Sequence, residues 1–238
     1  RSASPRPDDV ALLMYTSGTT GVPKGVMLTQ ANLVANARAI SAEHGLGPGD
    51  RVLAVLPLYH INAFVVTMLA PLAHGGGLVM PPKFSATAFW GQAARGGCTW
   101  INVVPTIIAY LLNAPDPRAQ GLDISRIKFC RSASAPLPPE LHRAFEEKFG
   151  IRIIETFGMT ETNAPCFTNP YEREKRKIGS PGRAFGNDAK VIDPATGTTQ
   201  PAGFIGAMWG EFSDVPDALD SAILEPEGDA VDVTLSFW

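Results

Sequence analysis

The residues best suited to chemistry lie in one segment, Tyr15–Gly25, which reads YTSGTTGVPKG. Its glycines let the backbone turn tightly and bring N–H groups close to an anion. Its hydroxyl side chains add hydrogen-bond donors, and Lys24 adds a positive charge. The segment therefore predicts a loop that binds a polyphosphate. The candidate ligands are Thr16, Ser17, Gly18, Thr19, Thr20, Gly21 and Lys24.

This segment differs from a Walker A phosphate loop, which requires Gly-x-x-x-x-Gly-Lys-Ser/Thr. Here Lys24 lies three residues after Gly21 and stands between Pro23 and Gly25. The alternative interpretation is a Ser/Thr/Gly-rich surface turn without a ligand. The length of the uninterrupted pattern favours the phosphate loop.

A second segment, Glu155–Glu161, reads ETFGMTE and follows an apolar run. A magnesium ion held by substrate phosphates needs only one or two protein oxygens. Glu161 offers a carboxylate, Thr160 offers a hydroxyl, and the ring of Phe157 could pack against a purine. Alone, Glu161 would be an ordinary surface carboxylate. Together with the glycine-rich loop, it predicts a magnesium–nucleotide site.

The two segments together resemble the motifs of the AMP-forming acyl-adenylating enzymes, which include acyl-CoA synthetases, luciferases and adenylation domains. The resemblance runs from about Asp9 to about Gly206. It implies that Lys24 and its loop hold the β- and γ-phosphates of ATP, and that Thr160 and Glu161 lie at the Mg²⁺ ion. One departure is that the family more often has tyrosine where this chain has Phe157.

Three further segments resemble family motifs in the expected order. His60 resembles a gating residue near the acid, Ser134, Ala135 and Pro136 resemble a turn along the adenine, and Val103 and Pro105 resemble a wall of the acid pocket. Alone, they would be a packed or surface histidine, a small-residue turn and a strand-to-helix junction. The resemblance adds further nucleotide-binding candidates, and Gly158 is also a candidate for contact with the acid. These candidates are Thr156, Phe157, Gly158, Met159 and Thr160.

The implied reaction begins when a carboxylic acid attacks the α-phosphate of Mg·ATP, which gives acyl-AMP and pyrophosphate. Coenzyme A then takes the acyl group as a thioester. Two alternatives stay open: an enzyme that hands the acyl group to a carrier protein or to oxygen, and a nucleotide-binding remnant without turnover.

The residue types near the predicted site favour a fatty or aryl acid over an amino acid. A buried ammonium group would need a carboxylate partner, because an unpaired buried charge is costly. The segments around His60, Val103–Thr106 and Phe157–Met159 are mostly apolar or small.

The bulk composition is typical of a globular enzyme domain. The chain has 238 residues, is 45% hydrophobic and 18% charged, and carries a net charge of −3. This balance argues against wholesale disorder and gives no electrostatic reason to expect nucleic acid as a partner. The cysteines Cys98, Cys130 and Cys166 are far apart, which predicts buried thiols in a reducing compartment, the cytoplasm. The longest apolar stretch, 61–73, is too short and interrupted to span a membrane.

Alternating apolar runs and amphipathic segments predict an α/β fold with mainly parallel sheets and flanking helices. The first run, Val10–Tyr15, is continuous, and we expect it to be a strand buried on both faces. Because ligands bind beyond the carboxyl ends of parallel strands, the segments after residues 15 and 156 should face one crevice. Strands are predicted at 10–15, 51–56, 78–80, 100–104, 127–131 and 151–156, and helices at 30–43, 61–72, 85–94, 106–113 and 138–149.

From Lys190 the pattern changes to short strands and turns, as at the start of a small β-rich subdomain. We therefore divide the chain into an α/β AMP-binding region, 1–189, and a region 190–238 that contains the start of this subdomain and an atypical tail. Family members are about twice as long and add a ribose-binding aspartate motif, a hinge and a C-terminal domain with a catalytic lysine. The acidic segment Trp209–Trp238 does not resemble that continuation. The resemblance therefore implies the central part of a larger acyl-CoA synthetase.

Overall fold

The computed structural model describes residues 4–16, 23–193, 195–196, 198–199 and 207–211, with the backbone alone for residues 191 and 207–211. Five predicted phosphate-loop residues lie outside the described residues: Ser17, Gly18, Thr19, Thr20 and Gly21. The segment from residue 212 onward does so as well. The described elements are β1 (Val10–Thr16), β2 (Lys24–Thr29), α1 (Gln30–Glu43), β3 (Arg51–Ala54), η1 (Asn62–Leu69), α2 (Ala70–His74), β4 (Gly77–Val79), α3 (Phe89–Arg95), β5 (Trp100–Val103), α4 (Pro105–Asn113), η2 (Arg118–Gln120), β6 (Phe129–Ser132), α5 (Pro139–Phe149), β7 (Arg152–Met159), β8 (Ala164–Thr168), η3 (Arg173–Lys175), β9 (Arg183–Ala184), β10 (Asp188–Ile192) and β11 (Ala207–Glu211).

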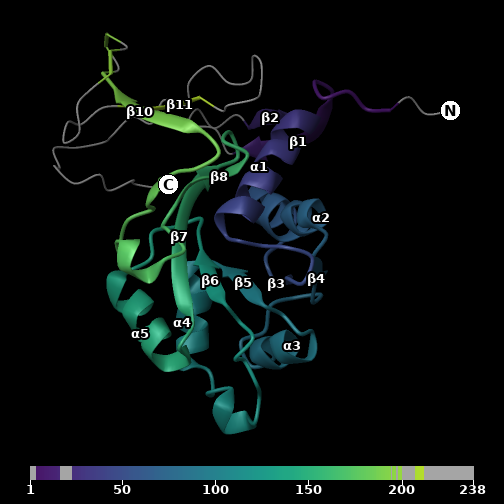
Figure 1. The fold of residues 1–238 in the computed structure, drawn as a ribbon, viewed down its shortest axis with the longest axis vertical. Coiled ribbons are helices and arrows are strands. Elements are labelled where there is room, and N and C mark those ends of the chain that lie inside the picture. Colours follow the sequence, from purple (N-terminus) through teal and green to yellow (C-terminus); the bar gives the residue numbers. More distant parts are fainter. Residues whose placement is uncertain (1–3, 17–22, 194, 197, 200–206, 212–238) are drawn as a thin grey trace.

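A mixed sheet with helices on both faces forms the centre of the molecule (Figure 1). Within the described residues its strand order is β4-β3-β5-β6-β7-β8-β9. The strands from β4 to β7 pair in parallel, whereas β8 and β9 add on in antiparallel fashion. The expectation of an α/β fold built mainly on parallel pairing is therefore confirmed.

Two apolar clusters hold the helices to the sheet. One contains Phe89, Ile108 and Phe145 and packs α3, α4 and α5 against one face. The other contains Ile40 and Val65 and packs α1 and η1 against the opposite face. Because both faces are covered, the parallel strands are apolar almost throughout, as buried strands should be. This makes any polar side chain within them informative.

The helix after the predicted phosphate loop begins and ends as its sequence indicates. Thr29 caps α1 by accepting a hydrogen bond from the Asn32 backbone N–H at 3.2 Å. The Asn32 side chain in turn accepts from the Thr29 N–H at 2.9 Å, which completes a capping box. At the other end Gly45 adopts a φ of 58°, which is favourable for glycine. The predicted helix 30–43 is confirmed.

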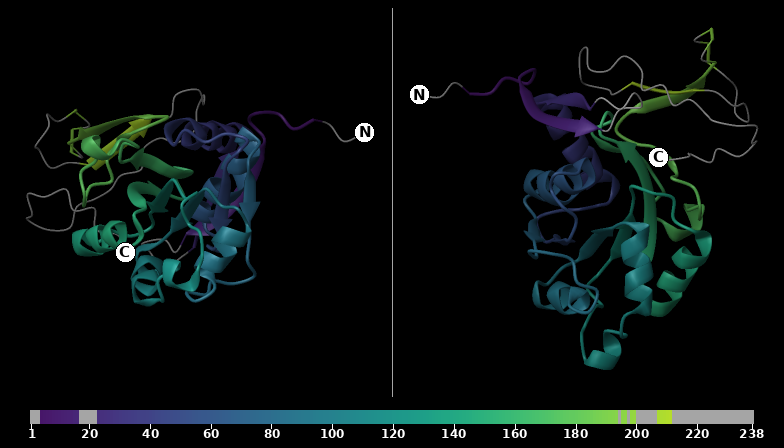
Figure 2. Two further views of the ribbon diagram at one scale, coloured as in Figure 1. Left: turned by 60° about the horizontal axis from the view of Figure 1, so that its bottom comes forward. Right: turned by 180° about the vertical axis from the view of Figure 1, so that it is seen from behind.

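The first strand differs from its prediction. β1 pairs with β2 as an antiparallel hairpin outside the main sheet, and the two views of Figure 2 show it at the same end of the molecule as the β10–β11 hairpin. Met14 and Leu28 are buried on one face, but Leu13 and Tyr15 are exposed on the other. Burial on both faces was therefore the wrong expectation. A hairpin that packs on one side buries only every second residue, whatever the hydrophobicity of the run.

Two other elements correct the predicted boundaries. β7 continues to Met159, three residues beyond the predicted strand, because β8 returns beside it and bonds to its last residues. The segment expected as one helix over 61–72 is wound as a π-helix, η1, and then as α2. Its first residue, Asn62, is buried. Wide π-helical turns often occur beside functional sites.

Candidate functional site

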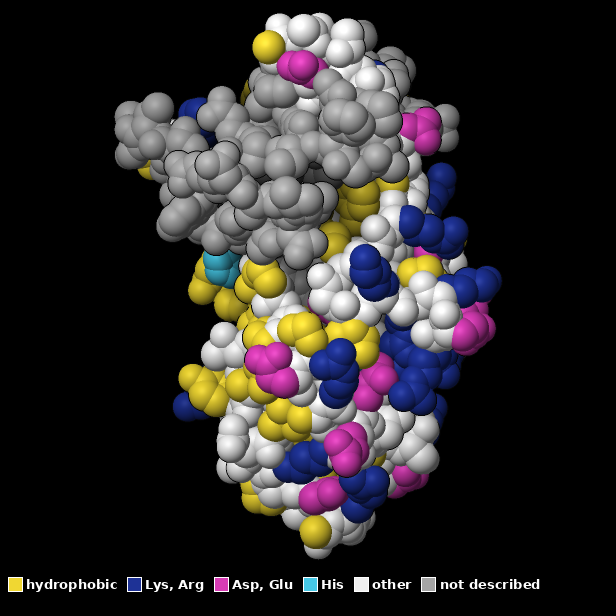
Figure 3. Space-filling model, turned by 90° about the vertical axis from the view of Figure 1, so that its left-hand side faces the viewer, with side chains coloured by type: hydrophobic (Ala, Val, Ile, Leu, Met, Phe, Trp, Pro, Cys, Tyr) yellow, Lys and Arg dark blue, Asp and Glu magenta, His cyan; other side chains and the backbone are white. Residues whose placement is uncertain are grey.

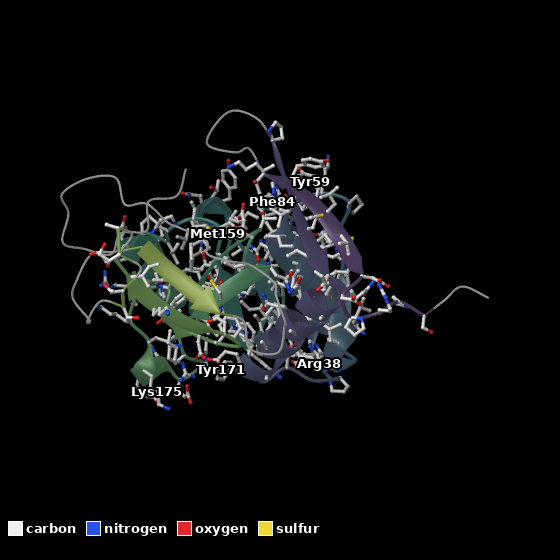
Figure 4. The ribbon with its side chains drawn as sticks, turned by 90° about the horizontal axis from the view of Figure 1, so that it is seen from above. Arg38, Tyr59, Phe84, Met159, Tyr171 and Lys175 are labelled. Atoms are coloured by element: carbon white, nitrogen blue, oxygen red, sulfur yellow. The ribbon has the colours of Figure 1, made fainter. Side chains whose placement is uncertain are left out.

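The predicted site segments follow the carboxyl ends of four parallel strands, β3, β5, β6 and β7. His60 follows β3, Pro105 follows β5, Ser134 follows β6 and Thr160 follows β7. Because the strands are parallel neighbours, these segments begin at the same edge of the sheet. Figure 4 labels Tyr59 and Met159, the chain neighbours of His60 and Thr160.

The described ends of the predicted phosphate loop face each other across the β1–β2 hairpin. Thr16 pairs with Lys24 in the last described register position before the loop. Lys24 is exposed and Thr16 is half-buried. The hairpin thus presents a lysine at the base of the loop, where its charge is open to an incoming anion.

Helix α1 is bonded directly to the turn that carries Thr160 and Glu161. The Asn36 amide donates to the carbonyl oxygens of Thr162, at 3.5 Å, and of Asn163. All three residues are buried. The hairpin leads into α1 without a gap, so this contact links the two strongest motifs of the sequence.

Residues 160–163 form a tight turn between β7 and β8. The Asn163 backbone N–H donates to the Thr160 carbonyl at 3.0 Å, and Asn163 adopts a φ of 57°. The Thr162 hydroxyl accepts from the Met159 N–H and donates to the Ala164 carbonyl, both at 2.8 Å. The turn is therefore rigidly bonded, while Thr160 and Glu161 stay half-buried within it.

Three candidates on β7 lie within the strand. The Phe157 ring is 3% exposed and lies 6.1 Å, centroid to centroid, from the ring of Phe167. Gly158 has a packing reason to be glycine, because a Cβ there would overlap the Ala164 carbonyl oxygen. The buried Thr156 hydroxyl has no hydrogen-bond partner among the described residues. A buried hydroxyl usually has such a partner, so the Thr156 hydroxyl is available to a ligand.

The small-residue turn after β6 carries backbone strain. Ser134 adopts a φ of 72°, in the left-handed region that non-glycine residues rarely occupy. Its hydroxyl accepts a hydrogen bond from the Asn62 side-chain amide at 3.0 Å. Ser134, Ala135 and Pro136 are all exposed. Such strain gathers at ligand-binding sites, so the geometry supports a functional role for this turn.

A buried polar network, which the sequence analysis missed, lies behind this turn. Arg131 on β6 is 1% exposed, and its Nη1 donates to Asn62 Oδ1 and Asn102 Oδ1, each at 2.8 Å. Asn102 also donates to Asn62 Oδ1 at 3.3 Å. The signal was available in the sequence, since Arg131 is a lone charge in a buried strand, Phe129–Ser132.

His60 and the predicted acid wall occupy different environments. His60 is exposed, and its ring is tilted by 53° to that of Tyr59, with 4.7 Å between the ring centroids. Val103 is fully buried in the cluster beneath α3, α4 and α5, and Pro105 is a buried first residue of α4. His60 thus lies two residues before Asn62, which is bonded to Ser134, whereas Val103 packs into the cluster on the opposite face of the sheet.

Glu155, which opens the second motif, belongs to a structural network. His142 lies between Glu155 Oε1, at 2.9 Å from its Nδ1, and Glu146 Oε1, at 3.2 Å from its Nε2. Glu155 also accepts from the Gly179 N–H at 3.0 Å, and Arg176 donates to Glu146 at 2.9 Å. Burial opposes the charges of both His142 and Glu146, but their mutual hydrogen bonds prevail: the pKa of His142 is raised and the pKa of Glu146 is lowered to about 2.

The surface on this side carries charges of both signs. Lysine and arginine side chains alternate with acidic ones over the α5 side (Figure 3). Within the charged segment 171–177, which reads YEREKRK, Lys175 pairs with Glu172 at 3.2 Å. Arg173 and Arg176 both pair with Glu146. Arg173, Lys175 and Arg176 are thus engaged with carboxylates of the chain.

The remaining expectations concern metal ligands, thiols and membrane spans. Among the described residues, no three His, Cys, Asp or Glu side chains gather where they could hold a metal ion. One carboxylate and one hydroxyl, Glu161 and Thr160, fit an ion held mostly by substrate phosphates. Cys98, Cys130 and Cys166 are buried free thiols, as predicted. In the described part of the chain, no helix has the length and hydrophobicity to cross a bilayer.

Comparison with known proteins agrees with this geometry. The profile described as "AMP-binding enzyme" matches residues 1–211. A sulfoacetate–CoA ligase of Cupriavidus necator is 63% identical over 204 residues, 86% of this chain and 39% of the relative. An oxalate–CoA ligase of Arabidopsis thaliana is 36% identical over 192 residues, 79% of this chain and 37% of the relative. The chain thus spans about two fifths of these relatives' length.

Solved structures show the same fold. ATP-bound MatB from Rhodopseudomonas palustris superposes with a TM-score of 0.77 at 34% identity, over 87% of this chain and 40% of that one. The O-succinylbenzoate coenzyme A synthetase MenE of Bacillus subtilis, in complex with ATP and magnesium, gives 0.76 at 29% identity, over 86% and 41%. The chain therefore shares the fold of part of these larger proteins.

Proposed function

Because the chain belongs to the AMP-binding enzyme family, we propose that the complete protein is an AMP-forming acid–thiol ligase. It activates a carboxylic acid with ATP to acyl-AMP, releases pyrophosphate and transfers the acyl group to coenzyme A. The relatives are named as CoA ligases, which favours coenzyme A over a carrier protein or oxygen as the acceptor.

One observation carries the proposal furthest: the hydrogen bonds from Asn36 on α1 to the turn 160–163. They fix the helix that follows the predicted phosphate loop against the turn of Thr160 and Glu161. A polyphosphate at the loop and an oxygen-bound cation at the turn can then be neighbours. Acid activation depends on such positioning and on stabilising charge in the leaving pyrophosphate.

The proposed roles follow from charge and place. Lys24 neutralises phosphate charge, Thr16 and the loop 17–21 donate hydrogen bonds to the phosphates, and the backbone of Ser134, Ala135 and Pro136 lies along the adenine. Thr160 and Glu161 hold a magnesium ion, which when bound would neutralise phosphate oxygens. His60, exposed beside the same edge, is placed to contact the acid. Thr156, Phe157, Gly158 and Met159 form the strand end beneath the nucleotide.

Location and domain division belong to the same proposal. Three free buried thiols suit the reducing cytoplasm. The α/β region 1–189 carries the proposed nucleotide site, and the antiparallel pair β10–β11, which begins at Asp188, supports a small β-rich subdomain near the proposed boundary at residue 190.

The acid has two candidate classes. The apolar and small residues near His60 favour a fatty or aryl acid. The polar network at Asn62, together with relatives named for sulfoacetate and oxalate, favours a short acid with a second anionic group, and we give this class preference.

The test is isotope exchange between pyrophosphate and ATP by the complete protein, followed by detection of acyl-CoA. The panel should contain sulfoacetate, oxalate, malonate, a fatty acid, an aryl acid and amino acids. We expect exchange and thioester with at least one simple carboxylate. Nucleotide binding without exchange for any acid would instead identify a non-catalytic remnant, and exchange without acyl-CoA would favour another acceptor.

A further inference from the structure

Arg131 is a buried cation that has no carboxylate partner among the residues that the structure describes. Arg131 lies on β6 and is 1% exposed. Its side chain makes no ion pair within the described residues. Nη1 contacts only neutral amide oxygens, and Nε has no hydrogen-bond partner there. Burial lowers the pKa of Arg131 to about 9, so the guanidinium stays protonated at neutral pH.

This arrangement is costly for the folded protein alone. Removing a charge from water without a counterion is strongly unfavourable. The charge of Arg131 also acts on His44. Burial is the larger cause and the charge of Arg131 the second, and together they lower the pKa of His44 to about 4. By contrast, Arg176, another buried arginine, pairs with Glu146. Since no described residue supplies an anion to Arg131, a ligand is suited to supply one.

Hydrogen bonds connect the buried guanidinium of Arg131 to the exposed residue Ser134 near the predicted acid site. Because Arg131 and Asn102 both donate to Asn62 Oδ1, the amide of Asn62 has a fixed orientation. Its Nδ2 then points to the exposed Ser134, whose strained backbone holds the hydroxyl at 3.0 Å. Asn62 also lies two residues beyond His60. At the exposed end of the network, the neutral donor groups of Asn62 and Ser134 thus lie above the positive charge of Arg131.

Neutral donors above a buried cation form an anion-binding site. We propose that Asn62, Asn102, Arg131 and Ser134 recognise a second anionic group, a sulfonate or carboxylate, on the acid substrate. Asn62 and Ser134 make the contacts, whereas Arg131 determines specificity from beneath by its charge. The inference rests on the proposed ligase function and assigns the residues that select the acid.

The experiment compares acids of the same shape with and without the second charge. Malonate is paired with isovalerate, and sulfoacetate with 3,3-dimethylbutyrate. The complete protein is assayed by pyrophosphate exchange as wild type and as the Arg131→Met and Arg131→Lys variants. Arg176→Met is the matched control, because it removes another buried arginine from a network without site residues.

We expect wild type to prefer the doubly charged acids. Arg131→Met should lose a hundredfold or more in kcat/KM for them, mainly through KM, yet stay within about threefold for the neutral analogues. Arg131→Lys should retain part of the preference, and Arg176→Met should leave the ratio between paired acids unchanged. Equal losses for both acid classes in Arg131→Met, or no loss, would overturn the inference.

Removing a buried arginine can also impair folding. Ser134→Ala avoids this because Ser134 is exposed, and it should lower the preference for the charged acids about tenfold while the melting temperature stays unchanged. An unaltered preference in Ser134→Ala would contradict the proposed contact. Exchange with neutral acids only would refute the second-anion site and leave the ligase function standing. No exchange with any acid would refute the ligase function itself.

Discussion

The side chain of Asn163 donates a hydrogen bond of 2.5 Å to the backbone carbonyl of Asn32. Asn32 lies in the first turn of α1, and Asn163 closes the turn after β7. With the reverse bonds from Asn36, two segments more than a hundred residues apart are joined through buried amides. The spacing between the proposed phosphate loop and the proposed magnesium ligands therefore depends on hydrogen bonds of Asn32, Asn36 and Asn163.

Replacing Asn36 should loosen this spacing. In Asn36→Ala the carbonyls of Thr162 and Asn163 lose a buried donor, which should lower the free energy of unfolding by about 1–3 kcal/mol. KM for Mg·ATP should rise as well. Urea denaturation and ATP titration of the exchange rate measure the two effects. Arg38→Ala, an exposed change on the same helix, is the control and should alter neither; matching effects from it would argue against the contact.

Lys24 should be required for adenylation by charge rather than by packing, since its side chain is exposed. Stabilisation of developing charge is typically worth about 2.7–4 kcal/mol. Lys24→Ala should thus reduce the adenylation rate by roughly a hundredfold or more without changing the melting temperature. Lys175→Ala removes an exposed lysine on the other side of the view from Tyr59 in Figure 4, and it should have wild-type activity. A fully active Lys24→Ala variant would rule out the assigned role.

The sequence predicted the helix ends correctly where residues next to the helix determine them. Thr29 and Gly45 placed the ends of α1, and Gly150, with a φ of 70°, ended α5 as expected. The errors occurred where tertiary pairing decides. Apolar content alone did not reveal that β1 would form a one-sided hairpin, nor that β8 would lengthen β7 to Met159.

The candidate site divides in the same way. Its motif segments could be predicted because glycine, hydroxyl and charge occur close together in the chain. The network of Asn62, Asn102 and Arg131 joins three distant segments, so only the fold could show it. The same holds for Asn36 and Asn163. Neither belongs to a recognisable local pattern, and only the fold shows that they are bonded to each other.

The network of His142, Glu146 and Glu155 predicts how stability depends on pH. The pKa of Glu146 falls from 4.5 to about 2 on folding. Its stabilisation, on the order of 3 kcal/mol, is therefore complete above pH 4.5 and is lost as the pH falls toward 2. Because the pKa of His142 is raised above 6.5, its contribution is complete below that value and is lost as the pH rises through the folded pKa.

The Glu146→Gln variant should be less stable at pH 6, yet lose less stability than wild type on acidification from pH 4.5 to 2. Urea unfolding across this range measures the difference. Glu147→Gln is the matched control, because Glu147 is the exposed neighbour on the same helix. If the free energy of unfolding of both variants falls with pH as in wild type, then Glu146 is not the group whose protonation destabilises the protein in acid.

Gly158, in the second motif, has two candidate roles that can be separated by experiment: close packing against β8 and contact with the acid. Its Cα lies so close to β8 that an added Cβ would overlap the carbonyl of Ala164 and the backbone of Pro165. Backbone atoms cannot yield as a flexible side chain can, so Gly158→Ala must move β8 away from β7. We expect a loss of stability of about 1–3 kcal/mol, with or without ligands, and weaker adenylation because the turn of Thr160 and Glu161 shifts with β8. Gly49→Ala is the control, since a Cβ at Gly49 would have no neighbour within 4 Å. Calorimetric melting of the ligand-free protein separates the roles: if Gly158→Ala melts with wild type and only KM for the acid rises, then the glycine serves the substrate rather than the sheet.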